Sequence, residues 1–169
     1  MQRVLVIGCS GAGKSTLSRK LAELTGLPLI HLDREYWQPG WAAPDNDAWL
    51  VRLRELVAGP RWIMDGNFGG TLPLRVALAD TIIFLDFPTP LCIWRVLRRV
   101  ARTYGQTRID MAAHCPERFD WAFLVWVYRW RRNSRPRVLA AMEGFQGSIE
   151  VLRNPGDVAA FLARIGQIT

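Results

Sequence analysis

The sequence lacks most of the features that mark secreted, membrane-spanning and zinc-binding proteins. Its 169 residues include only three cysteines, which are scattered and form no Cys-x-x-Cys pair, so neither a disulfide framework nor a structural zinc site is expected. No stretch approaches the roughly 18 apolar residues that a membrane helix needs. The first apolar run, VLVI, leads directly into a glycine-rich turn, which does not fit a signal peptide. We therefore expect a cytoplasmic protein without a membrane segment.

Lysine is almost absent, and arginine supplies nearly all of the positive charge. Only Lys14 and Lys20 are lysines among the 22 basic residues, and the net charge is +7. Segment 95–137 contains eleven arginines and three acidic residues, a net of +8, whereas the rest of the chain has a net of −1. This basic segment fits three interpretations: a solvated surface, a clamp for polyphosphate, or a surface for nucleic acid.

Short apolar runs alternate with segments of helical periodicity along the chain. Strands are predicted over residues 3–7, 27–32, 61–65, 81–87 and 148–152, and helices over 14–25, 45–58, about 90–103, 119–132, 136–143 and 155–165. Strands that are apolar on both faces and alternate with helices form parallel sheets covered on both sides. We expect a single α/β domain over residues 1–169, with ligands at the carboxyl ends of its strands.

The segment GCSGAGKS, residues 8–15, fits the phosphate-binding pattern G-x-x-x-x-G-K-[ST] at every fixed position. Its glycines allow the loop to turn N–H groups inward, and the helix that follows adds the positive end of its dipole. Lys14 is expected to reach the outer phosphates of ATP, and the Ser15 hydroxyl to bind Mg²⁺. The residues expected to contact the nucleotide are Gly8, Ser10, Gly11, Ala12, Gly13, Lys14, Ser15 and Thr16.

The segment HLDREYWQPGW, residues 31–41, follows the second predicted strand and should face the phosphate loop. Asp33 could take a proton from an acceptor hydroxyl, anchor that hydroxyl by a hydrogen bond, or cap a helix. Trp37 could stack on a planar ring or a sugar, or pack the loop onto the core. Asp33 and Trp37 are therefore candidate acceptor-binding residues, whereas His31 fits a core histidine better than an acid or base.

The segment WIMDGNFGGTLPLR, residues 62–75, places a carboxylate at the end of the third predicted strand. Asp65 is favoured over Asp86 as the residue that holds Mg²⁺ through its water shell, because a glycine and an asparagine follow it. Asn67 and Arg75 are candidate hydrogen-bond partners of an acceptor.

The basic segment has the pattern of a lid over a phosphate site. Arg95, Arg98, Arg99 and Arg102 recur on one helical face, where like charges destabilise an isolated helix, so an anionic partner is expected. A second basic helix follows, and the insertion at about 103–120 between the two helices is predicted to be a lid. Lid arginines would neutralise the transferring phosphoryl group and exclude water. The arginines favoured for this role are Arg95, Arg99, Arg132 and Arg135.

These motifs, together with ADTIIFLDFP and GQTRIDMAAHCPERFD, resemble a group of small P-loop proteins related to adenylate kinase and labelled "DNA topology modulation protein". The resemblance implies a five-stranded parallel sheet with a small helical lid, ATP and Mg²⁺. It also implies that Asp65 matches the aspartate of the adenylate kinase DGFPR motif and that Asn154 lies near the adenine. The sequence reads DGNFGG at this motif, so the arginine that would bind the phosphate of AMP has no counterpart there.

The sequence therefore predicts a kinase that transfers the γ-phosphate of ATP to a nucleotide or small-molecule acceptor. The alternative is an ATP-binding regulator that contacts DNA through segment 95–137. No helix-turn-helix or zinc-finger pattern supports the second interpretation, and the oligomeric state is not predicted.

Overall fold

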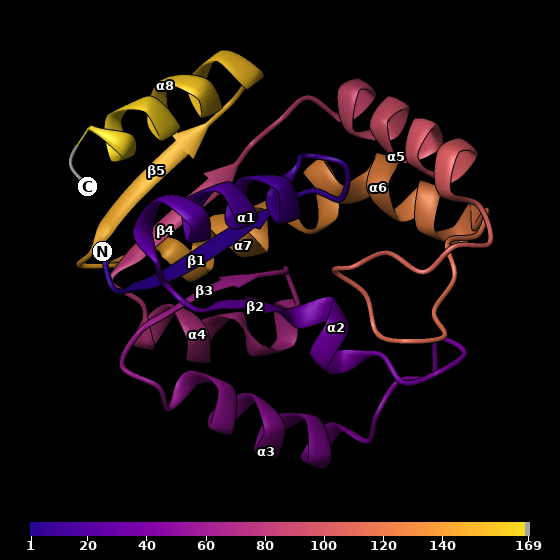
Figure 1. Cartoon of the computed structure of the whole chain (residues 1–169), viewed down its shortest axis with the longest axis horizontal. Helices are drawn as coiled ribbons and strands as arrows, with labels where there is room; N and C mark the ends of the chain where they lie inside the picture. The colour runs from indigo at the N-terminus through magenta and orange to yellow at the C-terminus, as the bar shows by residue number, and fades with distance from the viewer. Residues whose placement is uncertain (168–169) are drawn as a thin grey trace.

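Five parallel strands form the centre of the molecule in the computed structural model, which describes residues 1–167 (Figure 1). The strands are β1 (Arg3–Gly8), β2 (Leu29–His31), β3 (Trp62–Asp65), β4 (Thr81–Leu85) and β5 (Ser148–Leu152). Their order across the sheet is β2-β3-β1-β4-β5, and every neighbouring pair is parallel. The residues of β3 and β4 are all buried, as apolar strands covered on both faces must be. The predicted five-stranded parallel α/β fold is confirmed.

Helices cover both faces of this sheet. They are α1 (Lys14–Thr25), α2 (Leu32–Tyr36), α3 (Asn46–Val57), α4 (Leu72–Leu78), α5 (Thr89–Thr103), α6 (Trp121–Asn133), α7 (Arg135–Met142) and α8 (Pro155–Gly166), with a short 3₁₀ helix, η1, at Gly69–Thr71. In Figure 1, α1 crosses in front of the sheet, whereas α6 and α7 lie behind it. Helix α1 packs against α8, and α4 packs against α7. None of the described helices has the length and apolar character required to cross a membrane.

Two short helices have no counterpart in the sequence prediction. Helix α2 has five residues and follows β2 directly, so Asp33 lies in its first turn rather than in a loop. Helix α4 has seven residues, with Pro73 in its first turn. Elements of this length span at most two turns, which is too few for an apolar periodicity to stand out from its flanking residues.

The segment between α5 and α6, residues 104–120, crosses the open end of the sheet without forming a helix; we call it the covering segment (Figure 1). It meets the loop 37–42, which lies between α2 and α3. The Gly40 amide donates to the His114 carbonyl (3.0 Å), and the Trp41 indole Nε1 donates to the Pro116 carbonyl (3.0 Å). Met111 and Cys115 form a small buried cluster on which the tryptophans of that loop pack. The covering segment and loop 37–42 therefore enclose the space in front of the phosphate loop.

Candidate active site

The phosphate loop is held in shape by its backbone and by two side chains from other elements. Gly11 and Gly13 have φ of 84° and 100°, a region that glycine adopts without strain. The Asn67 side chain accepts from the Gly8 amide (3.0 Å) and donates to the Gly8 carbonyl (2.7 Å). Arg95 donates to the Ala12 carbonyl (3.2 Å). The loop is therefore preformed, and Asn67 fixes its first residue.

The first cavity, of about 750 Å³, lies along the phosphate loop and the start of α1. It contains Lys14 and Ser15, and its far side is formed by Pro155 and other residues of α8. Of the residues predicted to bind the nucleotide, Ser10, Gly11, Ala12, Gly13, Lys14, Ser15 and Thr16 line it, whereas Gly8 and Asn154 do not. Asn154 instead caps α8 by accepting from the Asp157 amide (3.0 Å), so its neighbour Pro155 faces the cavity in its place.

Asp65 brings a buried carboxylate to the first cavity at the end of β3. Its Oδ1 lies 2.7 Å from Nδ1 of His31, while its buried Oδ2 has no hydrogen-bond partner among residues 1–167. Burial lowers the pKa of His31, but the hydrogen bond and charge of Asp65 outweigh burial, and the net shift is upward. An unpartnered carboxylate oxygen of a residue that lines the same cavity as Ser15 fits a hard cation such as Mg²⁺, which needs few protein ligands. Within residues 1–167, no three Asp, Glu, His or Cys side chains are grouped as a complete metal site.

Asp33 lines both this cavity and a second one, and the residue is half-buried. Burial raises its pKa above the ordinary 3.8; the neighbouring carboxylate of Asp65 adds to this effect, and the charge of Lys14 opposes it. The side chain is therefore placed at the junction of the two cavities and is a stronger base than an exposed aspartate.

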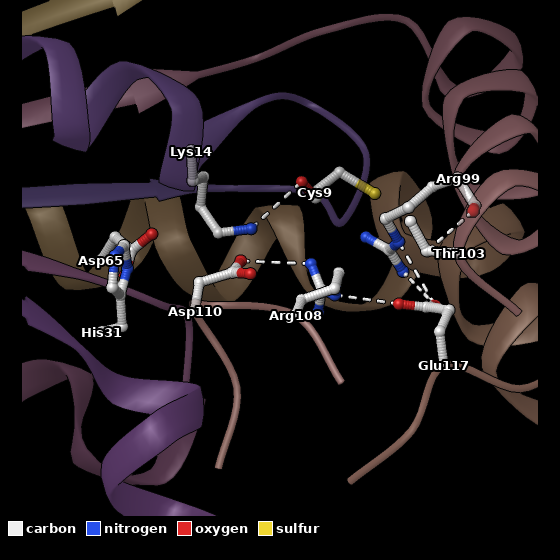
Figure 2. A network of polar contacts seen from close by, with 9 residues as sticks. All are labelled: Cys9, Lys14, His31, Asp65, Arg99, Thr103, Arg108, Asp110 and Glu117. Atoms are coloured by element: carbon white, nitrogen blue, oxygen red, sulfur yellow. Dashed lines mark hydrogen bonds and ion pairs between the residues drawn. The ribbon is translucent and has the colours of Figure 1, made fainter. Parts of the chain in front are cut away.

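A chain of alternating charges runs through the covering segment from Asp110 to Arg99 of α5 (Figure 2). Arg108 binds Asp110 (3.1 Å), and Arg99 binds Glu117 (3.1 Å). Arg108 Nε also lies 2.9 Å from Glu117 Oε2, as an ion pair without hydrogen-bond alignment. Burial raises the pKa of Asp110, but the charge of Arg108 and a hydrogen bond from Ser15 outweigh it and hold that pKa low. Glu117 therefore holds two arginines in front of the phosphate loop.

The four arginines predicted for the lid separate into two pairs. Arg95 and Arg99 line the first cavity. Arg132 is exposed and lines neither cavity. Arg135 also lies outside both, because it binds the Asp86 carboxylate through two hydrogen bonds (2.9 and 2.7 Å) and holds the pKa of that carboxyl low. The Asp86 carboxylate is thus paired with an arginine, and the residue does not line either cavity.

Arg75 is fully buried and does not reach either cavity. Its guanidinium donates to the carbonyls of Gly66 (3.0 Å), Phe68 (3.0 Å) and Asn67, and burial lowers its pKa to about 9. The residue therefore supports the turn after β3, which carries Asn67, instead of presenting a cation to an acceptor. Sequence spacing placed it near the site but could not indicate which way its side chain points.

The second cavity, of about 510 Å³, meets the first at Lys14 and Asp33. Trp37, Trp41 and Phe68 line it from the β2–β3 side, and Phe123 and Trp126 line it from α6. Asn67 also borders it. Trp37 and Asn67, two of the predicted acceptor-binding residues, therefore do lie at this cavity. Arg108, Asp110 and Glu117 were not singled out from the sequence; the only available signal was a few charges in the segment predicted as a lid.

Three solved structures with a similar fold are kinases. A shikimate kinase from Acinetobacter baumannii, solved with shikimate, has a TM-score of 0.61 and 20% identity over 99% of this chain and 92% of its own. A shikimate kinase from Bacteroides thetaiotaomicron has a TM-score of 0.58 and 15% identity over 99% of this chain and 97% of its own. A deoxyadenosine kinase from M. mycoides, solved with dCTP, has a TM-score of 0.53 and 12% identity over 97% of this chain and 98% of its own.

The chain has a P-loop kinase fold. Its identity to these structures is too low to carry more than the fold. No family model and no curated protein matches the sequence, so the resemblance to the topology modulation group remains a prediction. In this P-loop kinase fold, the two cavities lie at the carboxyl ends of β1 and β3, where parallel α/β sheets bind their ligands.

Proposed function

We propose that the protein is an ATP-dependent phosphotransferase that moves the γ-phosphate of ATP to the hydroxyl group of a small acceptor. The observation that carries this proposal is the meeting of two cavities at Lys14 and Asp33. The phosphate loop lines the first cavity from Ser10 to Ser15, whereas only its Ser10 and Lys14 reach the second. An enzyme that transfers a phosphoryl group between two ligands needs this arrangement, because catalysis of the transfer rests on positioning and charge stabilisation.

ATP occupies the first cavity, with its phosphates on the loop amides and Lys14. The Lys14 ammonium now donates to the Cys9 carbonyl (3.3 Å), so it stays within the loop and turns to the phosphates when they bind. Ser15 and Asp65 hold Mg²⁺, which neutralises phosphate charge when bound. Arg95 and Arg99 border the same cavity and stabilise the charge that builds on the transferring group.

Asp33 acts on the acceptor. Its position at the junction of the cavities brings it to the hydroxyl that attacks the γ-phosphorus. Its raised pKa lets it accept the hydroxyl proton more readily than an ordinary aspartate. The covering segment excludes water from the junction, which prevents hydrolysis of ATP in place of transfer.

The test is the release of ADP from Mg·ATP in the presence of pools of nucleosides, nucleoside monophosphates, sugars and small metabolites. We expect one pool to stimulate turnover and Lys14→Ala and Asp33→Asn to abolish the stimulation. Arg54→Gln, on the exposed side of α3, is the matched control and leaves turnover unchanged. ATP binding without stimulation by any pool would instead favour the ATP-binding regulator that contacts DNA. That regulator would show DNA affinity falling steeply with salt.

A further inference from the structure

The two cavities differ in their balance of charge. The basic residues that line the first cavity are Lys14, Arg19, Lys20, Arg95, Arg99 and Arg108, and its acidic residues are Asp33, Asp65 and Asp110. Arg99 pairs with Glu117, and Arg108 pairs with Asp110. The other four basic side chains against Asp33 and Asp65 still leave a positive excess, which suits a polyphosphate. The first cavity is therefore built for the more highly charged of the two ligands.

The second cavity has no such excess once Lys14, which serves the phosphates, is set aside. Its arginines are Arg99, Arg108 and Arg118, and its carboxylates are Asp33, Glu117 and Asp120. Glu117 pairs with two of these arginines, and the Arg118 guanidinium lies over the Trp41 ring, 5.7 Å from its centroid. An anionic acceptor would find no surplus cation here to offset its desolvation.

Aromatic rings dominate the second cavity instead. Five rings line it: Trp37, Trp41, Phe68, Phe123 and Trp126. The rings of Phe123 and Trp126 are stacked at 5.8 Å with an interplanar angle of 14°, and Trp37 meets Trp41 edge to face at 5.5 Å. Among residues 1–167, the first cavity is lined by one aromatic ring, Phe87. Flat aromatic faces recognise flat rings by stacking, with little preference among them.

We propose that the acceptor is an uncharged, flat-ringed compound that carries a hydroxyl group, which is the chemistry of a nucleoside. This inference rests on the proposed function and narrows it. The hydroxyl oxygen bonds to the γ-phosphorus of ATP, the bond from that phosphorus to the β,γ-bridging oxygen breaks, and ADP keeps the electron pair. The hydroxyl proton passes to Asp33 and then to solvent. A cavity of about 510 Å³ is of the size that small-molecule sites have.

The experiment compares four classes of acceptor that separate ring from charge. Nucleosides carry the ring and the hydroxyl, and nucleoside monophosphates add charge to the same ring. Uncharged sugars carry the hydroxyl without the ring, and a cyclic polyol carboxylate carries charge without it. ADP release gives kcat/KM for each class. Calorimetric titration in the presence of a non-hydrolysable ATP analogue measures binding separately from turnover. We expect nucleosides to exceed every other class by about tenfold or more in kcat/KM.

Two variants on α6 test whether stacking causes the preference. Trp126 lines the second cavity, whereas Trp121 does not, and both side chains are exposed, so neither change threatens the core. Trp126→Leu should raise the nucleoside KM about tenfold through lost stacking, with kcat little changed. Trp121→Leu should leave both constants as they are. An equal effect of the two substitutions would count against a stacked ring.

The possible outcomes separate this inference from the proposed function. Nucleoside binding that depends on Trp126, without ADP release, would support the acceptor class and overturn phosphotransfer. Preferred phosphorylation of an anionic or ring-free acceptor would keep the kinase and overturn the acceptor class. Failure of nucleosides to bind beside the ATP analogue would also overturn the acceptor class, whatever the turnover with other compounds.

Discussion

The phosphate loop and the second cavity are built in different ways, although they share Lys14. The loop is one short stretch of chain, shaped by glycine backbone angles and fixed at Gly8 by Asn67. The second cavity is assembled by side chains from loop 37–42, the turn after β3, the covering segment and α6. A site made from backbone is encoded locally, whereas a site made from side chains exists only when distant segments have come together.

Among single substitutions, the largest effect on the phosphate loop is expected from one methyl group added to its backbone. Gly11 has φ of 84°, and a Cβ there would clash with the Cys92 carbonyl oxygen of α5. We expect Gly11→Ala to lower the free energy of unfolding by about 3 kcal/mol and to abolish ATP binding, because both the φ angle and the close packing oppose it. Denaturant unfolding and calorimetry with Mg·ATP measure the two effects.

The matched control is Gly26→Ala at the end of α1. This glycine also has a positive φ, 64°, but no atom of the described part of the chain lies within 4 Å of its added Cβ. Gly26→Ala should lower the free energy of unfolding by about 1 kcal/mol through backbone strain alone and leave ATP binding intact. Equal losses in the two variants would mean that the contact with α5 does not shape the loop.

Asp33→Asn tests the role of the residue at the junction of the two cavities. We expect turnover to fall about 100-fold or more, because the proton acceptor is lost. Since burial raises the pKa of Asp33 above 3.8, the native fold disfavours its charged form. This cost is absent below the unfolded-state pKa and is fully present above the raised folded-state pKa. The variant should therefore be more stable than the natural protein at pH 7, and the difference should shrink towards pH 4.

The kinetic counterpart is the acid limb of the pH profile. In the natural protein, kcat/KM should rise with pH through the raised pKa of Asp33, and thus above pH 3.8. A variant that loses activity without gaining stability at pH 7 would contradict the burial of a charged Asp33.

Glu117→Gln tests whether side chains hold the covering segment. Glu117 is buried and pairs with Arg99 and Arg108, whose like charges would then face each other. We expect the free energy of local opening of this segment to fall by about 2 kcal/mol, which would appear as roughly 30-fold faster hydrogen exchange at the amides of residues 105–117. Amides of β1 should keep their protection. Glu55→Gln, in an exposed pair with Arg52, should change exchange very little.

The smallest effect is expected from Arg135→Gln, which removes both hydrogen bonds of Arg135 to buried Asp86 but leaves Arg131, 3.8 Å from the same carboxylate. Because Arg135 holds the pKa of Asp86 below 3.8, the pair stabilises the fold above that pH and loses its contribution as pH falls through the lowered value. Because Arg135 is partly exposed and Arg131 remains near Asp86, we expect the free energy of unfolding at pH 7 to fall by about 1 kcal/mol, with kcat unchanged. A fall in kcat at constant stability would instead support the lid role predicted from the sequence. Arg132→Gln is the exposed control.

The same contrast explains what the sequence could predict. The phosphate loop, the sheet and the positions of Asp33 and Asp65 followed from local patterns, because strand ends and a glycine-lysine turn leave their marks within a few residues. The acidic partners of Arg99 and Arg135 could not be predicted in this way, since each partner lies at least 18 residues away in the chain. Helical spacing placed Arg99 on a basic face but gave no sign that Glu117 would pair with it.

Arg75 and the tryptophans of α6 show a second limit. Arg75 occupies a sequence position that suits ligand binding, yet its donors satisfy backbone carbonyls. In α6, Trp130 is buried while Trp121 and Trp126 are exposed, although all three lie in one apolar run. The orientation of a side chain depends on which elements pack around its helix, and a single sequence does not contain that information.

The contacts between loop 37–42 and the covering segment have a consequence for the order of events in a catalytic cycle. The bonds from Gly40 to His114 and from Trp41 to Pro116 join the two segments, so neither can swing away alone without breaking them. Arg108, in the same segment, borders both cavities. One gate therefore serves two substrates, and we expect steady-state kinetics in which each product delays the departure of the other.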